Sequence, residues 1–95
     1  MVRLTRIEID ENLKSLNGWI FSDNKIEKEF KLKDFSGALD FVNKIGIEAE
    51  KMDHHPDILI HSWNKVKIFL STHSAGGITA NDFNLASKIE TIAGW

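Results

Sequence analysis

Two short runs of alternating side chains, residues 58–62 and 66–72, constrain the fold of this chain more than any other feature. Successive side chains of a β-strand point to opposite faces of the sheet, so residues of one parity share a face. Five aliphatic residues share one parity across the two runs: Ile58, Ile60, Val66, Ile68 and Leu70. The runs therefore predict an antiparallel hairpin with one apolar face, which must be covered by another layer.

A second hairpin is predicted nearer the start of the chain. The runs 19–23 and 25–32 are rich in strand-forming residues, and the polar pair Asp23-Asn24 separates them. A short polar break between two such runs is typical of a hairpin turn.

Capping patterns and apolar spacing place three helices. Thr5 followed by Glu8 is a capping box, and it predicts a first helix over 5–16. Thr79 followed by Asp82 has the same pattern and starts a third helix after Gly76-Gly77. The apolar residues of this third helix recur at helical spacing, at Phe83, Ala86, Ile89 and Ala93.

The second helix is the longest. Asp34 is its predicted N-cap, and the helix must end near Asp53 because Pro56 disfavours helical geometry in the residue before it. Its apolar stripe repeats every three or four residues, at Phe35, Ala38, Leu39, Val42, Ile45, Ala49 and Met52. The order α-β-β-α-β-β-α predicts an α+β fold: a two-layer domain spanning residues 1–95, with a four-stranded antiparallel sheet and helices packed on one face.

The composition restricts the classes of function. A formal net charge of -2 gives no basic field for nucleic acid and no polybasic anchor for a membrane surface. No run approaches the roughly 20 apolar residues that span a bilayer, and the first ten residues do not resemble a signal peptide, so we expect a cytoplasmic protein. The chain has no cysteine, which excludes disulfides, a thiol nucleophile and cysteine-based metal sites.

Histidines gather at one end of the second hairpin. If Ile58 pairs with Leu70, His55 lies opposite His73, and His54 precedes His55 directly. Directly opposed residues of antiparallel strands have Cβ atoms roughly 5 Å apart. Three imidazoles would then converge at this end. His61 falls on the other face, near the turn at 63–65 and opposite Lys67, and is expected to be exposed.

The residues around these histidines favour proton transfer. A free imidazole has a pKa of about 6.5 and both gives and takes protons near neutrality. Glu50 lies one helical turn before His54, and Asp53 immediately precedes it, so either carboxylate could orient a ring. The chain has no serine nucleophile elbow and no glycine-rich phosphate loop. The simpler alternative is that Glu50 and Asp53 are solvated helix-end residues, Asp82 only caps its helix, and Trp19 only packs.

The motifs together resemble a known family. The segments EAEKMDHHPDI and WNKVKIFLSTHSAGGITANDFNLASKI, with Gly18-Trp19 and KDFSGALDF upstream, resemble the pterin-4a-carbinolamine dehydratases over nearly the whole chain. The distinguishing combination is HHP, an aromatic-Asn pair, THxxGG and a following aspartate. Ser74 and Ala75 depart from the side chains of animal relatives. The six residues between Pro56 and Trp63 leave room for a bulge in the predicted register.

The resemblance implies an activity and a site. It implies that His54, His55 and His73 catalyse the loss of water from a 4a-hydroxytetrahydropterin, giving the quinonoid dihydropterin, as a step in recycling the pterin cofactor of aromatic amino acid hydroxylases. The positions that match its substrate-binding residues are Glu50, Asp53, Ser71, Thr72, Asp82 and Trp19. The reaction needs no metal and no cofactor. Relatives assemble as homodimers or homotetramers, and the sequence leaves open which histidine acts as the acid and which as the base.

Two other classes of function remain open. The first is a protein-interaction module, because animal members of the family are also cofactors of a transcription factor. An apolar stripe exposed on the third helix would favour it, but Asn84, Ser87, Lys88 and Glu90 predict a solvated surface there. The second is a metal-dependent hydrolase, since three histidines can bind zinc. The usual spacing of two histidines one helical turn apart is missing, and adjacent residues such as His54 and His55 diverge on an extended chain.

Overall fold

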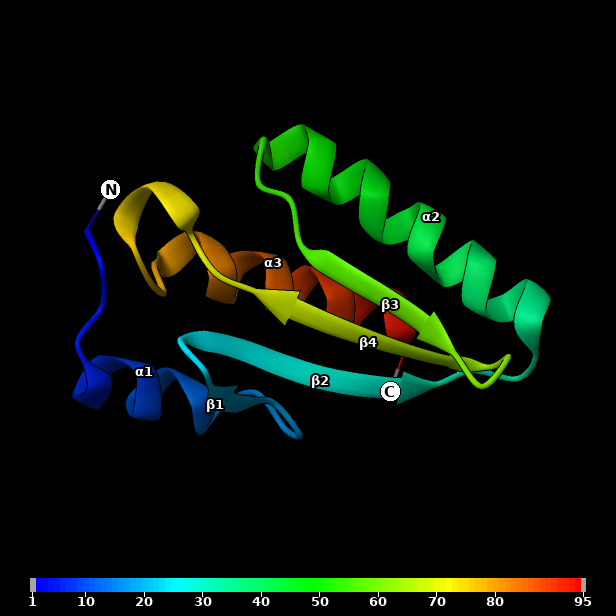
Figure 1. The fold of residues 1–95 in the computed structure, drawn as a ribbon, viewed down its shortest axis with the longest axis horizontal. Helices are drawn as coiled ribbons and strands as arrows, with labels where there is room; N and C mark the ends of the chain where they lie inside the picture. The colour runs from blue at the N-terminus through cyan, green and yellow to red at the C-terminus, as the bar shows by residue number, and fades with distance from the viewer. Residues whose placement is uncertain (1, 95) are drawn as a thin grey trace.

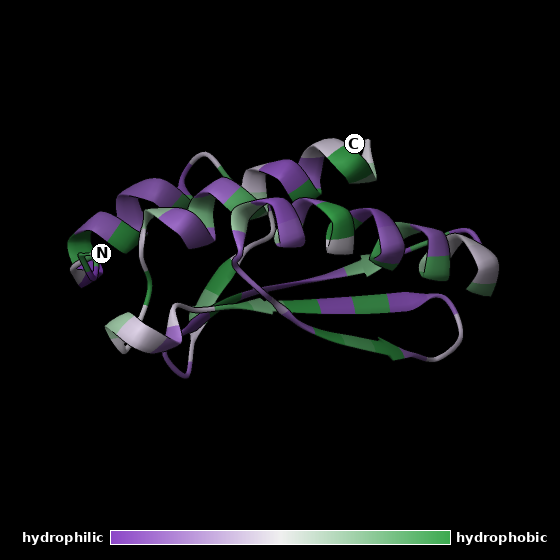
Figure 2. Cartoon of the chain, turned by 90° about the horizontal axis from the view of Figure 1, so that it is seen from above, coloured by the Kyte–Doolittle hydropathy of each residue, from purple (hydrophilic) through white to green (hydrophobic). Residues whose placement is uncertain are grey.

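The chain forms helices and strands in the predicted order (Figure 1), and the computed structural model describes residues 2–94. The elements are α1 (Arg6–Leu13), β1 (Ile20–Ser22), β2 (Lys25–Lys31), α2 (Phe35–Met52), β3 (Asp57–His61), β4 (Lys65–Leu70), the short 3-10 helix η1 (His73–Ala75) and α3 (Ala80–Ala93). The strands form one antiparallel sheet in the order β1-β2-β4-β3. Figure 2 shows α2 and α3 on the same side of this sheet, so the predicted two-layer α+β fold is confirmed.

The helices begin where the capping patterns predict. The Thr5–Glu8 and Thr79–Asp82 capping boxes both form, and the Asp34 carboxylate accepts a hydrogen bond from the Gly37 N–H at 2.7 Å. Helix α1 ends at Leu13, three residues before the predicted end. None of the helices within residues 2–94 combines the length and the apolar character that crossing a membrane requires.

The core lies between the sheet and the helices, and it differs from the predicted stripe on α2. The buried residues of α2 are Ala38, Phe41, Ile45 and Ala49. Phe41 is buried because its ring packs on Phe30 of β2, with the ring centroids 5.0 Å apart. This contact turns Phe35 and Leu39, which were predicted to be buried, toward solvent.

The register of the second hairpin also differs from the prediction. Ile58 pairs with Ile68 and not with Leu70, a slip of two residues. The slip keeps every aliphatic side chain on the core face, so the apolar pattern could not distinguish the two registers. The turn decides between them. Asn64 is buried, donates from its side chain to the Leu32 carbonyl at 3.0 Å, and accepts from the Leu32 N–H, which draws the turn back to 62–64.

Candidate active site

The end of α2 controls where the histidine pair lies. Asp53 adopts the left-handed conformation (φ 49°), its N–H donates to the Glu50 carbonyl, and the His54 N–H donates to the Ala49 carbonyl. This is the Schellman arrangement, with aspartate in the position usually taken by glycine. Asp53 therefore terminates the helix. Within residues 2–94 its exposed carboxylate makes no hydrogen bond or ion pair, so its predicted contact with substrate stays a prediction.

His54 turns inward from this point and meets a buried carboxylate. Its Nε2 lies 2.6 Å from Oδ1 of Asp82, which is 0% exposed, and His54 itself is 8% exposed. The other oxygen of Asp82 accepts hydrogen bonds from the Thr72 hydroxyl and the Thr79 N–H, each at 2.9 Å. The sequence indicated Asp82 as a capping residue and as a match to a site carboxylate of the family near His73, but it did not predict the contact with His54, which comes from a distant part of the chain.

These hydrogen bonds determine where the protons lie. Because Thr72 donates its hydroxyl proton to Asp82, the 2.7 Å contact between the Thr72 and Thr79 hydroxyls is a donation from Thr79 to Thr72. The Asp82 carboxylate has only lone pairs to offer, so His54 must carry a proton on Nε2. In its neutral form His54 then has its free lone pair on Nδ1. The arrangement fixes both the tautomer and the orientation of this ring.

His55 meets a carboxylate of a different kind. Its Nε2 lies 2.7 Å from Oε1 of Glu50, and both side chains are exposed, 57% for His55 and 77% for Glu50. The prediction that Glu50 serves His54 is wrong. The left-handed turn at Asp53 sends His54 into the interior and returns His55 over the last turn of α2. A groove of about 560 Å³ lies beside α2 and β3, and the residues that line it include Ile47, Glu50, His55, Pro56 and Ile58.

The predicted register placed His73 directly opposite His55, and this prediction is wrong. The pairing of β3 with β4 ends at Asp57 and Phe69, so both histidines lie outside the paired strands. His73 begins η1, is exposed, and follows Thr72 directly. Because Thr72 and His54 both contact Asp82, the shared carboxylate still joins the segment that carries His73 to the His54–His55 pair.

Two further residues match the family's site only in the sequence. Ser71 is half-buried between the end of β4 and Thr72. Trp19 is buried in the core, packs edge-on against Phe30 and donates its indole N–H to Glu90 at 3.1 Å.

Glu90 also pairs closely with Lys28 and is largely buried, so the expectation that it is solvated is wrong.

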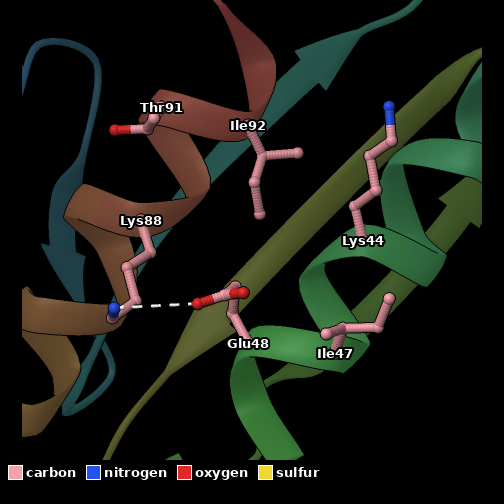
Figure 3. A pocket seen from close by; sticks show the side chains of 6 residues that line it. All are labelled: Lys44, Ile47, Glu48, Lys88, Thr91 and Ile92. Atoms are coloured by element: carbon pink, nitrogen blue, oxygen red, sulfur yellow. Dashed lines mark ion pairs between the residues drawn. The ribbon is translucent and has the colours of Figure 1, made fainter. Parts of the chain in front are cut away.

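A separate groove of about 590 Å³ lies between α2 and α3 and contains no histidine (Figure 3). Its charged groups are paired with one another or with neighbours: Lys88 Nζ lies 3.7 Å from Glu48, and Lys44 Nζ lies 3.0 Å from Asp40. The hydrogen bond from Lys51, helped by Lys88, holds the pKa of Glu48 below its usual range. This groove therefore has no imidazole and no unpaired charged group among its lining residues.

Comparison with known proteins agrees with the resemblance seen in the sequence. The chain is 50% identical over 90 residues to a Picosynechococcus protein, covering 95% of this chain and 97% of that one. It is 45% identical over 91 residues to a protein of Sulfolobus acidocaldarius, covering 96% and 99%. Both are named, provisionally, as pterin-4-alpha-carbinolamine dehydratases.

A solved structure and a family profile extend this likeness to the fold and to nearly the whole chain. A crystal structure of a transcriptional coactivator/pterin dehydratase from Brucella melitensis has a TM-score of 0.92 and 42% identity, covering 97% of this chain and 99% of that one. The profile described as pterin 4 alpha carbinolamine dehydratase matches residues 2–92. The chain therefore belongs to the pterin 4 alpha carbinolamine dehydratase family.

Proposed function

We propose that this protein dehydrates a 4a-hydroxytetrahydropterin to the quinonoid dihydropterin. The observation that carries the proposal is the pair of adjacent histidines, each held by its own carboxylate: His54 by buried Asp82, and His55 by exposed Glu50. Such pairs supply oriented imidazoles that can give or take a proton. Membership of the pterin 4 alpha carbinolamine dehydratase family supports a pterin as the substrate class.

The reaction requires proton transfer and no change of oxidation state. The bond from C4a to the hydroxyl oxygen breaks as that oxygen accepts a proton, N5 loses its proton, and a double bond forms between C4a and N5. An acid and a base are sufficient. His54 offers a lone pair on Nδ1 in its neutral form, while His55 and His73 are exposed and accessible to a substrate.

The setting of this activity is part of the proposal. A 4a-hydroxytetrahydropterin is what remains after an aromatic amino acid hydroxylase has used its pterin cofactor, so we propose a role in recycling that cofactor in the cytoplasm. We also propose a homodimer or homotetramer. The strands β1 and β3 are the two edges of the described sheet, and Phe35, Leu39 and Ile47 are exposed on α2.

A role as an interaction module is the second candidate. The same exposed residues of α2 favour it, and the solved relative is titled a transcriptional coactivator as well as a dehydratase. Among the described residues of α3, no large hydrophobic side chain is exposed, and the exposed ones include Asn84, Ser87 and Lys88, so such a surface would be on α2. A protein with only this role would leave pterin dehydration at its uncatalysed rate.

The purified protein should accelerate the dehydration of synthetic 4a-hydroxytetrahydropterin, followed by stopped-flow absorbance, without any added metal. EDTA should leave the rate unchanged, because proton transfer by imidazoles is sufficient for this reaction. A rate that disappears with the chelator and returns with zinc would show that a metal takes part. No acceleration above the uncatalysed rate would refute the proposed activity.

The exposed carboxylate of Glu50 should contribute much less to the dehydration rate than the buried carboxylate of Asp82. Exposed ion pairs contribute at most about 1 kcal/mol, so Glu50→Gln should lower the dehydration rate by less than about fivefold. The measurement is the same stopped-flow assay at low and high salt, since salt screens an exposed pair. A tenfold or greater loss that persists at high salt would mean that Glu50 acts on the substrate itself.

A further inference from the structure

The loop that carries His73 is closed by very few contacts of its own. Residues 72–77 form a small loop whose ends meet in an isolated bridge, with the Thr72 N–H donating to the Gly77 carbonyl at 2.8 Å. Inside it, the Gly76 N–H donates to the His73 carbonyl at 3.1 Å, and Gly76 adopts a left-handed conformation (φ 72°). These backbone contacts are local, and the hydrogen bond from the Thr72 hydroxyl to Asp82 anchors only the start of the loop, so neither holds its tip.

Two residues from distant parts of the chain hold the tip of this loop. The Asn24 side-chain amide donates to the Gly76 carbonyl at 2.9 Å, and Nη1 of Arg3 lies 3.5 Å from the same oxygen. The segment before α1 runs beside the loop (Figure 1), and the Leu4 N–H donates to the Ile78 carbonyl at 2.8 Å. Asn24 thus reaches the loop from the turn between β1 and β2.

The packing at Gly77 shows how closely the loop is covered. A Cβ atom on Gly77 would lie 2.7 Å from Cδ of Arg3 and 3.3 Å from Oδ1 of Asn24. Real Cβ contacts do not come as close as 2.7 Å, so a side chain here would have to displace Arg3. The absence of a side chain at Gly77 therefore leaves room for Arg3 and Asn24 to pack against the loop.

We propose that Asn24, supported by Arg3, is a positioning residue for His73 in pterin dehydration. This inference rests on the proposed function. Asn24 touches neither His73 nor the other two histidines. It acts through the Gly76 carbonyl, which lies in the same closed loop as His73.

Asp23, the neighbouring residue of the turn, provides a control that distinguishes the loop contact of Asn24 from its part in forming the turn. Asp23 and Asn24 both have positive φ, 52° and 60°, as the two central residues of a tight hairpin turn require. Within residues 2–94, Asp23 makes no side-chain hydrogen bond, whereas Asn24 contacts the loop. Glycine adopts this conformation at either position. Asn24→Gly removes the contact and keeps the turn, and Asp23→Gly is its matched control.

Three measurements test the proposal on the intact protein. Asn24→Gly should lower the dehydration rate about 3- to 10-fold, the effect expected for one lost hydrogen bond, while Asp23→Gly should not. Amide hydrogen exchange at Gly76 and Gly77 should accelerate in Asn24→Gly alone. In the His73→Ala background, Asn24→Gly should cause little further loss, because a residue that acts through His73 has nothing left to position.

Equal losses in the two glycine variants would overturn the proposal, as would unchanged exchange at Gly76 and Gly77. A full additional loss in the His73→Ala background would also overturn it. If the wild-type protein shows no dehydratase activity, the proposed function fails. Accelerated exchange confined to Asn24→Gly would then still support the anchoring of the loop, and unchanged exchange would refute it.

Discussion

Replacing Asp82 by asparagine should lower the rate of pterin dehydration by about 10²-fold or more, as loss of the carboxylate behind a catalytic histidine does in hydrolase triads. Asp82 reaches no solvent, so the effect would come through His54. The amide can offer an N–H where the carboxylate offered only lone pairs. Either His54 or Thr72 would then face a donor, and the ring would lose its fixed tautomer.

The same substitution should also destabilise the fold. A buried mismatched donor costs about 1–3 kcal/mol, which urea unfolding would measure. Glu8→Gln is the matched control, because Glu8 fills the equivalent capping-box position of α1 and contacts no histidine. If Glu8→Gln and Asp82→Asn lower the dehydration rate equally, or if Asp82→Asn stays fully active, Asp82 does not position a catalytic ring.

Alanine at His55 and alanine at His73 should each reduce the dehydration rate at least tenfold, since general acid–base groups typically contribute about 10²- to 10⁴-fold. Both side chains are exposed, so removing them should leave the core intact. Circular dichroism and the stopped-flow assay would separate a loss of folding from a loss of catalysis.

His61→Ala provides the comparison for these two variants. His61 contacts Glu29 at 2.5 Å and Ser62 at 3.0 Å, and this pairing keeps the pKa of Glu29 below its usual range. Like His55, it is an accessible histidine paired with a carboxylate, but it lies at the turn end of β3. Its removal should leave the rate within about twofold of wild type, as for most surface substitutions. Similar losses in all three alanine variants would refute the assignment of the site.

Local patterns were sufficient to predict most of the fold. Capping boxes at Thr5 and Thr79, the N-cap Asp34 and the stop before Pro56 all act through neighbouring residues, and each lies where the sequence placed it. The Asp23-Asn24 turn is local in the same way. These features also predicted that His54 and His55 follow the end of a helix.

The errors have a common cause in tertiary contacts. The alternation of apolar residues determines which face of the sheet a side chain occupies, but not which residue lies opposite it on the next strand. The prediction that His55 lies opposite His73 was therefore wrong. The partner of Glu50 depended on one left-handed residue, Asp53, at the helix end. The contact of His54 with Asp82 joins residues 28 apart in sequence, and no local pattern marks it.

The turn at 62–64 has a consequence for how variants of this protein should be interpreted. Ser62 and Trp63 both have positive φ, and buried Asn64 holds the turn against Leu32. The aliphatic face accepts a slip of two residues, which moves one strand along the other by about 6.6 Å. A variant that lets this turn slip should therefore keep a native-like circular dichroism spectrum and yet lose activity, because the far end of the hairpin, beside the histidines, would have shifted. Inactive but folded variants should accordingly be sought at this remote turn as well as in the site.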